Sequence, residues 1–281
     1  MGKRMRRVDT ADLLPGMITA EDVYNYNNQL ILPKGLILND QTITKLTFYS
    51  IIQVKVEDES VETATSSAPY ELSYSERIRT SPEFIKFRSE FTTDVDNFRH
   101  VINDVVQKGS PLDVDKLMNY TLNILDLSAT TPNLFDMLHS MREYDDATYV
   151  HCMNVALICN IFARWLRLGE EDTRLATISG LLHDIGKTKI PETIIKKPGK
   201  LTDQEYDIVK THPQVGYDIL KSSNLDPRIL DAVLMHHERC DGSGYPQGLK
   251  GEQISSFAKI VAIADVYDAM TSARIYRGPL C

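Results

Sequence analysis

Histidines and aspartates recur at five places in the C-terminal half of the sequence, each inside or at the end of an apolar segment. They are His151, the pair His183-Asp184, His212, the pair His236-His237, and Asp265. A single histidine on such a face is usually a satisfied core residue. Five independent exceptions are less probable than one shared centre, so we expect these side chains to converge.

Imidazole and carboxylate ligands together suit Fe, Mn, Zn or Ni ions, whereas a calcium site is built from oxygens alone. A carboxylate beside a histidine, as in His183-Asp184, can bridge two cations while the imidazole binds one. Bridged cations about 3.5–4 Å apart are a standard arrangement for activating water against a phosphoryl centre. Lys187 follows about one helical turn later, within reach of a leaving oxygen. The pattern therefore favours metal-dependent phosphoryl chemistry.

Composition limits the classes of protein to consider. The chain has 281 residues, of which 42% are hydrophobic and 25% charged, as in ordinary globular proteins, and its length favours two domains. A net charge of −8 argues against coating polymeric nucleic acid, so an anionic ligand needs a local positive site. The basic start lacks the apolar stretch of a signal peptide, and no run of about 18 apolar residues follows.

The cysteines indicate a reducing compartment, because they form no CxxC pair and no regular framework. They are Cys152, Cys159, Cys240 and Cys281. We therefore expect a cytoplasmic protein that does not bind a membrane.

The elements that must position the histidines lie in the helical part of the chain. Residues 1–58 alternate short apolar runs with turn signals and predict a small β-rich module with one helix near residues 40–49. A polar linker is expected over 59–80, a connecting helix over 81–108 and an all-helical domain over 109–281. The expected fold class is mainly α, a helical bundle behind a small β-rich N-terminal module.

Several helices are marked by their own signals. Residues 150–168 are apolar nearly all round, as in a central buried helix. Thr202 and Glu205 form a capping-box pattern, Asp226-Pro227 suits a helix start, and Ser255 or Ser256 can cap the helix of Asp265. Aromatic residues at helical spacing over 84–98 predict a packing seam or a homodimer helix.

Four ordered motifs carry a resemblance to a known family. They are HDIGK at 183–187, HP-x-x-G at 212–216, HHERCDGSGYP at 236–246 and DVYDAMTSARIYR at 265–277. The sequence resembles the HD-GYP family, a branch of the HD-domain metal-dependent phosphohydrolases, over roughly residues 110–281. Its L-x-P-G-M and L-P-K-G segments are similar to a small module often found ahead of such domains. The resemblance implies a helical bundle with a buried di- or trinuclear metal centre.

The resemblance also implies an activity, hydrolysis of cyclic di-GMP to the linear dinucleotide and in some members on to GMP. An attacking hydroxide held between the cations is part of that implied mechanism, with Asp184 as the bridging ligand. Lys187 matches the position that protonates the leaving ribose oxygen, and Tyr245, Arg274 and Arg277 match substrate contacts. The implied metal ligands are His151, His183, Asp184, His212, His236, His237 and Asp265.

Tyr245 follows a glycine-rich turn, and Gly242 and Gly244 allow backbone conformations that other residues resist, so we expect Tyr245 to face the substrate. Arginine suits phosphate because its planar fork binds two oxygens. Arg274 and Arg277 therefore match phosphate contacts, and the alternative interpretation is that they are two solvated charges at the end of a helix.

Two departures from the family pattern shape the expectations. Members with three metals have a glutamate four residues before the first histidine, where this chain has Ala147. We therefore expect two divalent ions, Fe or Mn before Zn or Ni, with His237 as the least secure ligand. Similar domains also continue past Cys281, so the pocket wall near Arg274 and Arg277 is expected to be incomplete.

Alternatives remain open at this point. The chain can be a phosphodiesterase for another cyclic dinucleotide, or a weak or inactive nucleotide sensor that acts as a scaffold for signalling partners. The basic loop 196–200 either steers the substrate or is a solvated turn. Cys240 as a thiolate ligand is disfavoured.

Overall fold

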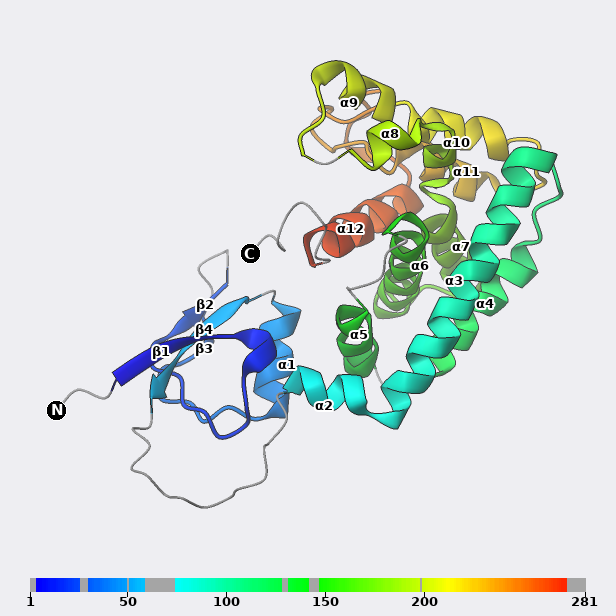
Figure 1. Ribbon diagram of the computed structural model, residues 1–281. Helices are drawn as coiled ribbons and strands as arrows, with labels where there is room; N and C mark the ends of the chain where they lie inside the picture. Colours follow the sequence, from blue (N-terminus) through cyan, green and yellow to red (C-terminus); the bar gives the residue numbers. More distant parts are fainter. Residues whose placement is uncertain are drawn as a thin grey trace. The chain divides into compact units, whose positions relative to one another are not determined.

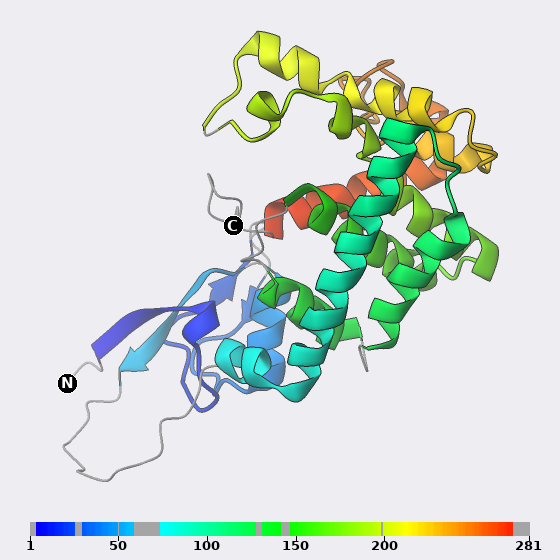
Figure 2. The same cartoon turned by 45° about the vertical axis from the view of Figure 1, so that its right-hand side comes forward.

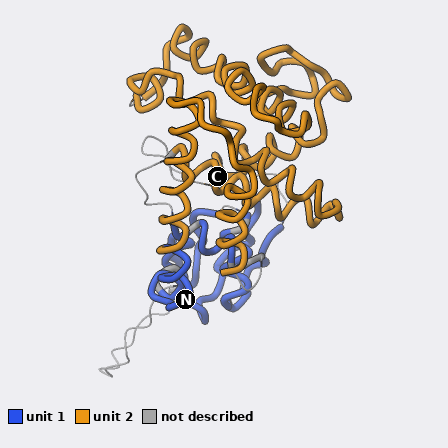
Figure 3. Tube along the Cα trace, turned by 90° about the vertical axis from the view of Figure 1, so that its right-hand side faces the viewer, with its two compact units in different colours: residues 1–88, 128–143, 279–281 blue, residues 89–127, 144–278 orange. Residues whose placement is uncertain are grey.

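The computed structural model describes residues 4–25, 30–49, 51–58, 74–127, 131–141, 147–197 and 199–271. The chain divides into two compact units, one of residues 1–88, 128–143 and 279–281 and the other of residues 89–127 and 144–278 (Figure 3). The predicted fold class, mainly helical with a small β-rich N-terminal module, is confirmed. The domain limits drawn from the sequence remain predictions.

Short strands form two antiparallel pairs in the N-terminal unit. They are β1 (Arg4–Asp9), β2 (Val23–Tyr24), β3 (Leu30–Leu32) and β4 (Gln53–Asp58). β1 pairs with β4 so that Val8 lies opposite Val54, and β2 pairs with β3. The predicted helix near residues 40–49 is confirmed as α1 (Asp40–Phe48), which begins with a capping box at Asn39.

This unit has a hydrophobic core of its own. α1 contributes Ile43 and Leu46, and the strands contribute alternate residues such as Val8, Val54 and Val56, all buried. Fully burying one such side chain stabilises a fold by about 1.5–3 kcal/mol. The unit also contains η1 (Thr10–Asp12), α2 (Tyr74–Thr80) and α5 (Thr131–Ser140). The predicted linker lies outside the described residues over 59–73, and α2 follows directly.

The second unit is helical (Figure 1). Its elements are most of α3 (Pro82–Lys108), then α4 (Val114–Asp126), α6 (Ala147–Trp165), α7 (Glu170–Leu182), η2 (Ile185–Lys189), α8 (Glu192–Ile195), α9 (Asp203–Val209), α10 (His212–Leu220), α11 (Pro227–Met235), η3 (Gly251–Gln253) and α12 (Ser256–Thr271). The seam predicted on α3 is buried within a single chain, with Phe87 and Phe91 fully buried.

α6 is the central helix of this unit. Residues 151–161 are all buried, as predicted, and α6 packs against α7 and α12 (Figure 2). The prediction was wrong for the C-terminal end, because Trp165 and Leu166 are 54% and 60% exposed. None of the described helices is both long and apolar enough to cross a membrane.

The predicted helix starts are confirmed and place the residues that follow. The Thr202 hydroxyl accepts a hydrogen bond from the Glu205 amide, in a capping box, at the start of α9. Asp226 accepts from the Arg228 amide at the start of α11, and Ser255 accepts from the Ala258 amide at the start of α12. These caps fix where α11 and α12 begin, and so the positions of His236 and Asp265.

Candidate metal centre

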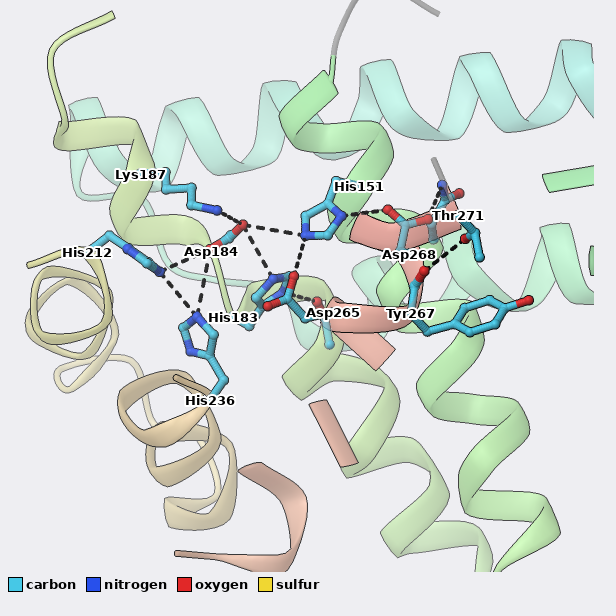
Figure 4. Close-up of polar contacts among 12 residues, drawn as sticks. His151, His183, Asp184, Lys187, His212, His236, Asp265, Tyr267, Asp268 and Thr271 are labelled. Carbon is cyan, nitrogen blue, oxygen red and sulfur yellow. Dashed lines mark hydrogen bonds and ion pairs between the residues drawn. The ribbon is translucent and has the colours of Figure 1, made fainter. Parts of the chain in front are cut away.

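Five elements bring the predicted histidines and aspartates together (Figure 4). Their nitrogen and oxygen atoms form two groups, and within each group they lie within 4.8 Å of one another. The first group, called the α10–α11 group, is Asp184, His212, His236 and His237. The second, called the α6–α12 group, is His151, His183 and Asp265. The structure thus unites all seven residues, and their role as ligands remains a prediction.

Three of the histidine rings are oriented by their own helical turns. In each, Nδ1 lies 2.7–2.8 Å from the carbonyl oxygen three residues earlier, in the pairs His183 with Gly180, His212 with Val209, and His236 with Val233. A ring nitrogen beside a carbonyl carries the hydrogen, which leaves Nε2 with a free lone pair. Nε2 of His212 and Nε2 of His236 are only 3.2 Å apart. Two lone pairs at that distance repel each other unless a cation or a proton lies between them.

The Asp184 carboxylate presents one oxygen to each group. Its Oδ1 lies 3.2 Å from His212 Nε2 and 3.8 Å from His236 Nε2. Its Oδ2 lies 3.4 Å from His183 Nε2 and 3.8 Å from His151 Nε2. A carboxylate in this position faces both groups at once.

The surroundings of Asp184 keep His236 and His237 neutral and the Asp184 carboxylate ionised. Burial and the neighbouring His237 hold the pKa of His236 well below its ordinary value, and burial with His212 lowers the pKa of His237 to about 3. Burial acts to raise the pKa of Asp184, but His183 and Lys187 hold it well below the ordinary value. Metal ions bind these protonation states, because both leave lone pairs available.

His151 has a different environment, since it lies between two carboxylates on α12. Its Nε2 is 3.0 Å from Asp265 Oδ1, and its Nδ1 is 2.6 Å from Asp268 Oδ2. Burial acts to lower the pKa of His151, but the hydrogen bonds to Asp265 and Asp268 raise it to about 9. A cation that binds at Nε2 therefore displaces a proton.

The residues fit a pair of divalent transition-metal ions. Within the described part of the chain, His183 Nε2 and Asp184 Oδ1 are buried atoms without a hydrogen-bond partner. Buried polar atoms in proteins are rarely left so, and two beside each other point to an ion. The mixed nitrogen and oxygen donors suit first-row transition metals. Divalent metal binding is also what the HD domain implies.

Lys187 and Tyr245 border these groups. The Lys187 ammonium lies 2.5 Å from Asp184 Oδ2. Although burial acts to lower it, the Asp184 carboxylate holds the pKa of Lys187 above its ordinary value. The ring of Tyr245 stacks on His237 with centroids 4.7 Å apart. Both residues therefore lie beside the two ligand groups, and their roles as proton donor and substrate contact remain predictions.

Other predictions fall outside the described residues. Arg274 and Arg277 lie beyond residue 271, so their predicted substrate contacts remain predictions. The side chain of Ala147 is also outside the described part, and the count of two ions based on it stays a prediction.

The histidine pair leads into a loop held by a buried carboxylate that sequence reasoning missed. Glu238 is 3% exposed and accepts hydrogen bonds from the amides of Gln247 at 2.7 Å and Leu249 at 2.9 Å. Gly244 is required because a Cβ there would overlap the backbone of Arg239 and Glu238. Glu238 therefore fixes the loop that carries Tyr245.

Asp268 and Asn154 were also missed, although a signal existed for Asp268. It follows Asp265 by three residues on a predicted helix, so the two carboxylates share one face. Asn154 offered no comparable signal, because its partner is Asp268, far along the chain.

Two weaker candidates stand apart from the centre. Cys240 is an exposed free thiol that belongs to neither ligand group. In the basic loop, Lys196 pairs with Glu192, and Lys197 lies 2.5 Å from Glu205. These ion pairs offset part of the positive charge and favour the solvated-turn interpretation.

Comparison with known proteins identifies the class. A model of the HD domain family matches residues 127–280, more than half of the chain. The chain therefore belongs to the HD domain family, and the HD-GYP resemblance drawn from its motifs is confirmed.

Curated relatives are similar over this region. A cyclic di-GMP phosphodiesterase of Pseudomonas aeruginosa is 45% identical over 147 residues, 52% of this chain and 36% of the relative. A cyclic di-GMP phosphodiesterase response regulator of Xanthomonas campestris pv. campestris is 44% identical over 135 residues, 47% of this chain and 36% of the relative. A 3′3′-cGAMP-specific phosphodiesterase of Vibrio cholerae is 36% identical over 186 residues, 62% of this chain and 36% of the relative. The matched region spans little more than a third of each of these relatives.

Proposed function

We propose that this chain is a metal-dependent phosphodiesterase that hydrolyses cyclic di-GMP to the linear dinucleotide. The observation that carries the proposal is the Asp184 carboxylate, with one oxygen toward each ligand group. The names of the relatives support a cyclic dinucleotide as the substrate.

Two divalent transition-metal ions are the proposed cofactors, with Fe or Mn preferred and Zn or Ni also compatible. His212, His236 and His237 would hold one ion, and His151, His183 and Asp265 the other, with Asp184 shared between them. When bound, such ions supply Lewis-acid chemistry that acidifies water and offsets charge on phosphoryl oxygens.

The side chains of the protein position the substrate and move the proton. In hydrolysis, a water oxygen forms a bond to phosphorus and the bond from phosphorus to the ribose oxygen breaks. Lys187 is the proposed donor of the proton that this leaving oxygen takes up, because its ammonium borders the centre beside Asp184. Tyr245, stacked on His237, is proposed to contact the substrate, and Arg274 and Arg277 to bind its phosphates.

The proposal extends to location and partners. The cysteines that the structure describes are free thiols, which supports a reducing compartment, and we place the protein in the cytoplasm. Self-association through the helix of residues 81–108 is part of the same proposal, as is contact with signalling proteins. Analytical ultracentrifugation tests self-association, and a monomer at high concentration would contradict it.

Incubating Mn²⁺- or Fe²⁺-loaded protein with cyclic di-GMP, and separately with 3′3′-cGAMP, tests the function by chromatography of the products. We expect linear dinucleotide from cyclic di-GMP and two metal ions per chain by elemental analysis. Asp184→Asn should lower turnover at least about 100-fold, because the shared ligand is lost. Asp218→Asn is the matched control, since this carboxylate pairs with Lys221 on α10 outside both groups.

Each other outcome has a definite meaning. Faster turnover of 3′3′-cGAMP would assign the substrate to that dinucleotide. Binding of cyclic di-GMP without linear product would support the sensor or scaffold function instead. Unchanged hydrolysis by Asp184→Asn would contradict the site, and three tightly bound ions would contradict the dinuclear centre.

A further inference from the structure

His151 is held differently from the other oriented histidines of the centre. Nδ1 of His183, His212 and His236 lies beside a backbone carbonyl, whereas Nδ1 of His151 lies 2.6 Å from the Asp268 carboxylate. A hydrogen bond to an ionised acceptor is roughly twice as strong as one between neutral groups. His151 therefore has a stronger orienting partner than the other three.

Asp268 is itself held in place. Its second oxygen, Oδ1, accepts a hydrogen bond of 3.0 Å from the Asn154 amide. Asn154 follows His151 by three residues on α6, so one face of α6 contacts both oxygens of the carboxylate. Figure 4 shows the contact between His151 and Asp268. The three residues are buried, with exposures of 8% for His151, 5% for Asn154 and 6% for Asp268.

α12 contacts the same ring from both sides. Asp265, one helical turn before Asp268, lies 3.0 Å from Nε2 of His151. The ring is thus fixed between two carboxylates of one helix, with Nε2 directed toward the α6–α12 group. A carboxylate at the far nitrogen of a ligating histidine fixes its tautomer and raises its basicity, and losing it typically weakens metal binding 10–100-fold.

We propose that Asp268, held by Asn154, is a positioning residue for His151 and sets the metal affinity of the α6–α12 group alone. This inference rests on the metal centre of the proposed function. The α10–α11 group takes its orientation from the backbone carbonyls of Val209 and Val233, so it does not depend on Asp268.

A Mn²⁺ titration of chelator-treated protein, followed by electron paramagnetic resonance, tests the proposal without any substrate. In Asp268→Asn we expect one of two Mn²⁺ sites to weaken about 10–100-fold and the other to stay within about 2-fold. Excess Mn²⁺ should restore the occupancy of the weakened site. Thr271→Val is the matched control, because it removes a buried hydroxyl that bonds the Tyr267 carbonyl on the same helix. It should change neither site.

A second variant keeps the test decisive if Asp268→Asn does not fold. Asn154→Ala leaves the Asp268 charge in place but removes the hydrogen bond from the Asn154 amide to Oδ1, and it should weaken the same single site about 2–10-fold, less than Asp268→Asn. His237→Ala removes a ligand of the α10–α11 group, so the α6–α12 group becomes the stronger Mn²⁺ site. Adding Asp268→Asn to this variant should then weaken that stronger site.

The outcomes separate this inference from the proposed function. Equal weakening of both sites, or no change in either, would overturn the role of Asp268. Wild-type protein that binds two Mn²⁺ ions yet hydrolyses no cyclic dinucleotide contradicts only the phosphodiesterase. Wild-type protein that binds no Mn²⁺ contradicts both.

Discussion

Lys187 and Asp184 form the closest charged contact of the centre, at 2.5 Å. Asp184 is the proposed shared metal ligand, and Lys187 is the proposed proton donor. The carboxylate faces both ligand groups, while the ammonium carries a proton at the border of the site. Since the lysine touches only one ligand, its contribution can be separated from metal binding.

Replacing Lys187 by Met tests its role as proton donor. We expect kcat to fall about 10²–10⁴-fold with little change in KM or metal content, because general acid catalysis contributes that much. The matched control is Lys189→Met, since this lysine lies on the same short helix and donates to the Val106 carbonyl. A large loss of metal in Lys187→Met would show instead that the residue supports the ligands.

Asp94 on α3 is a buried carboxyl outside the metal centre. Burial and the nearby Glu90 raise its pKa to about 6, above the ordinary value of an aspartate side chain. A carboxyl whose pKa is raised by folding costs stability when it ionises, so the cost is absent below about pH 4 and complete above about pH 6.

Asp94→Asn should therefore stabilise the protein at pH 8 by up to about 3 kcal/mol and have little effect at pH 4. Urea unfolding at the two pH values measures this difference. The control is Asp96→Asn on the same helix, whose side chain is 49% exposed and pairs with Arg99. An equal change at both pH values in Asp94→Asn would rule out the ionisation mechanism.

The short helix η2 and helix α10 approach so closely that only glycine fits between them. A Cβ on Gly186 would overlap the His212 carbonyl oxygen and lie 2.6 Å from the Gly216 amide nitrogen. This contact joins the segment of Asp184 to the helix of His212.

We expect Gly186→Ala to destabilise the protein by about 1–3 kcal/mol, because overpacking forces the backbones apart. It should also weaken Mn²⁺ binding, since His212 moves with its backbone. Gly169→Ala is the control, because a Cβ there meets nothing within 4 Å. Thermal unfolding and a metal titration measure both effects, and a neutral Gly186→Ala would contradict the close approach.

The loop after the histidine pair is a separate element anchored by Glu238. Its two amide hydrogen bonds hold the stretch that places Tyr245 against His237. Each hydrogen bond to a charged group contributes about 1.5–3 kcal/mol.

Glu238→Ala should loosen this loop and raise KM for cyclic di-GMP about 10-fold, and it should change kcat less than KM. Hydrogen exchange over residues 239–250 should become faster. Glu252→Ala, an exposed acidic change in η3, should alter neither quantity. Unchanged exchange in Glu238→Ala would show that the loop is held by other contacts.

Across the whole molecule, both ligand groups belong to the helical unit. They join residues from α6, α10 and α12 with others that follow α7 and α11, so bound ions act as cross-links within that unit. Any ligand that binds only the folded state stabilises it by an amount that grows with the logarithm of the ligand concentration relative to Kd.

Saturating Mn²⁺ should raise the Tm of the helical unit by roughly 5–10 °C at 100-fold excess over Kd. Mg²⁺ is the control and should shift it less, because it prefers oxygen ligands. Calorimetry with and without a chelator measures the shift, and any separate transition of the N-terminal unit should not move. If Mg²⁺ raised the Tm as much as Mn²⁺ does, that result would contradict a transition-metal site.

The sequence by itself determined the helix starts and the class of fold and predicted the candidate ligands, because these depend on local spacing. The capping box at Thr202 and the start of α11 at Asp226 are local interactions, and their expected positions were correct. The residue types and apolar surroundings of the seven candidate ligands are enough to predict them from the sequence.

Only the tertiary structure decided which atoms meet. The motifs do not specify three of these contacts. They are the approach of one Asp184 oxygen to each ligand group, the hydrogen bond from Asn154 to Asp268, and the hydrogen bonds by which Glu238 holds the loop. Asn154 and Asp268 are 114 residues apart, and they meet because α6 packs against α12. Helical periodicity says which face a residue occupies, whereas the partner of that face depends on how the helices pack.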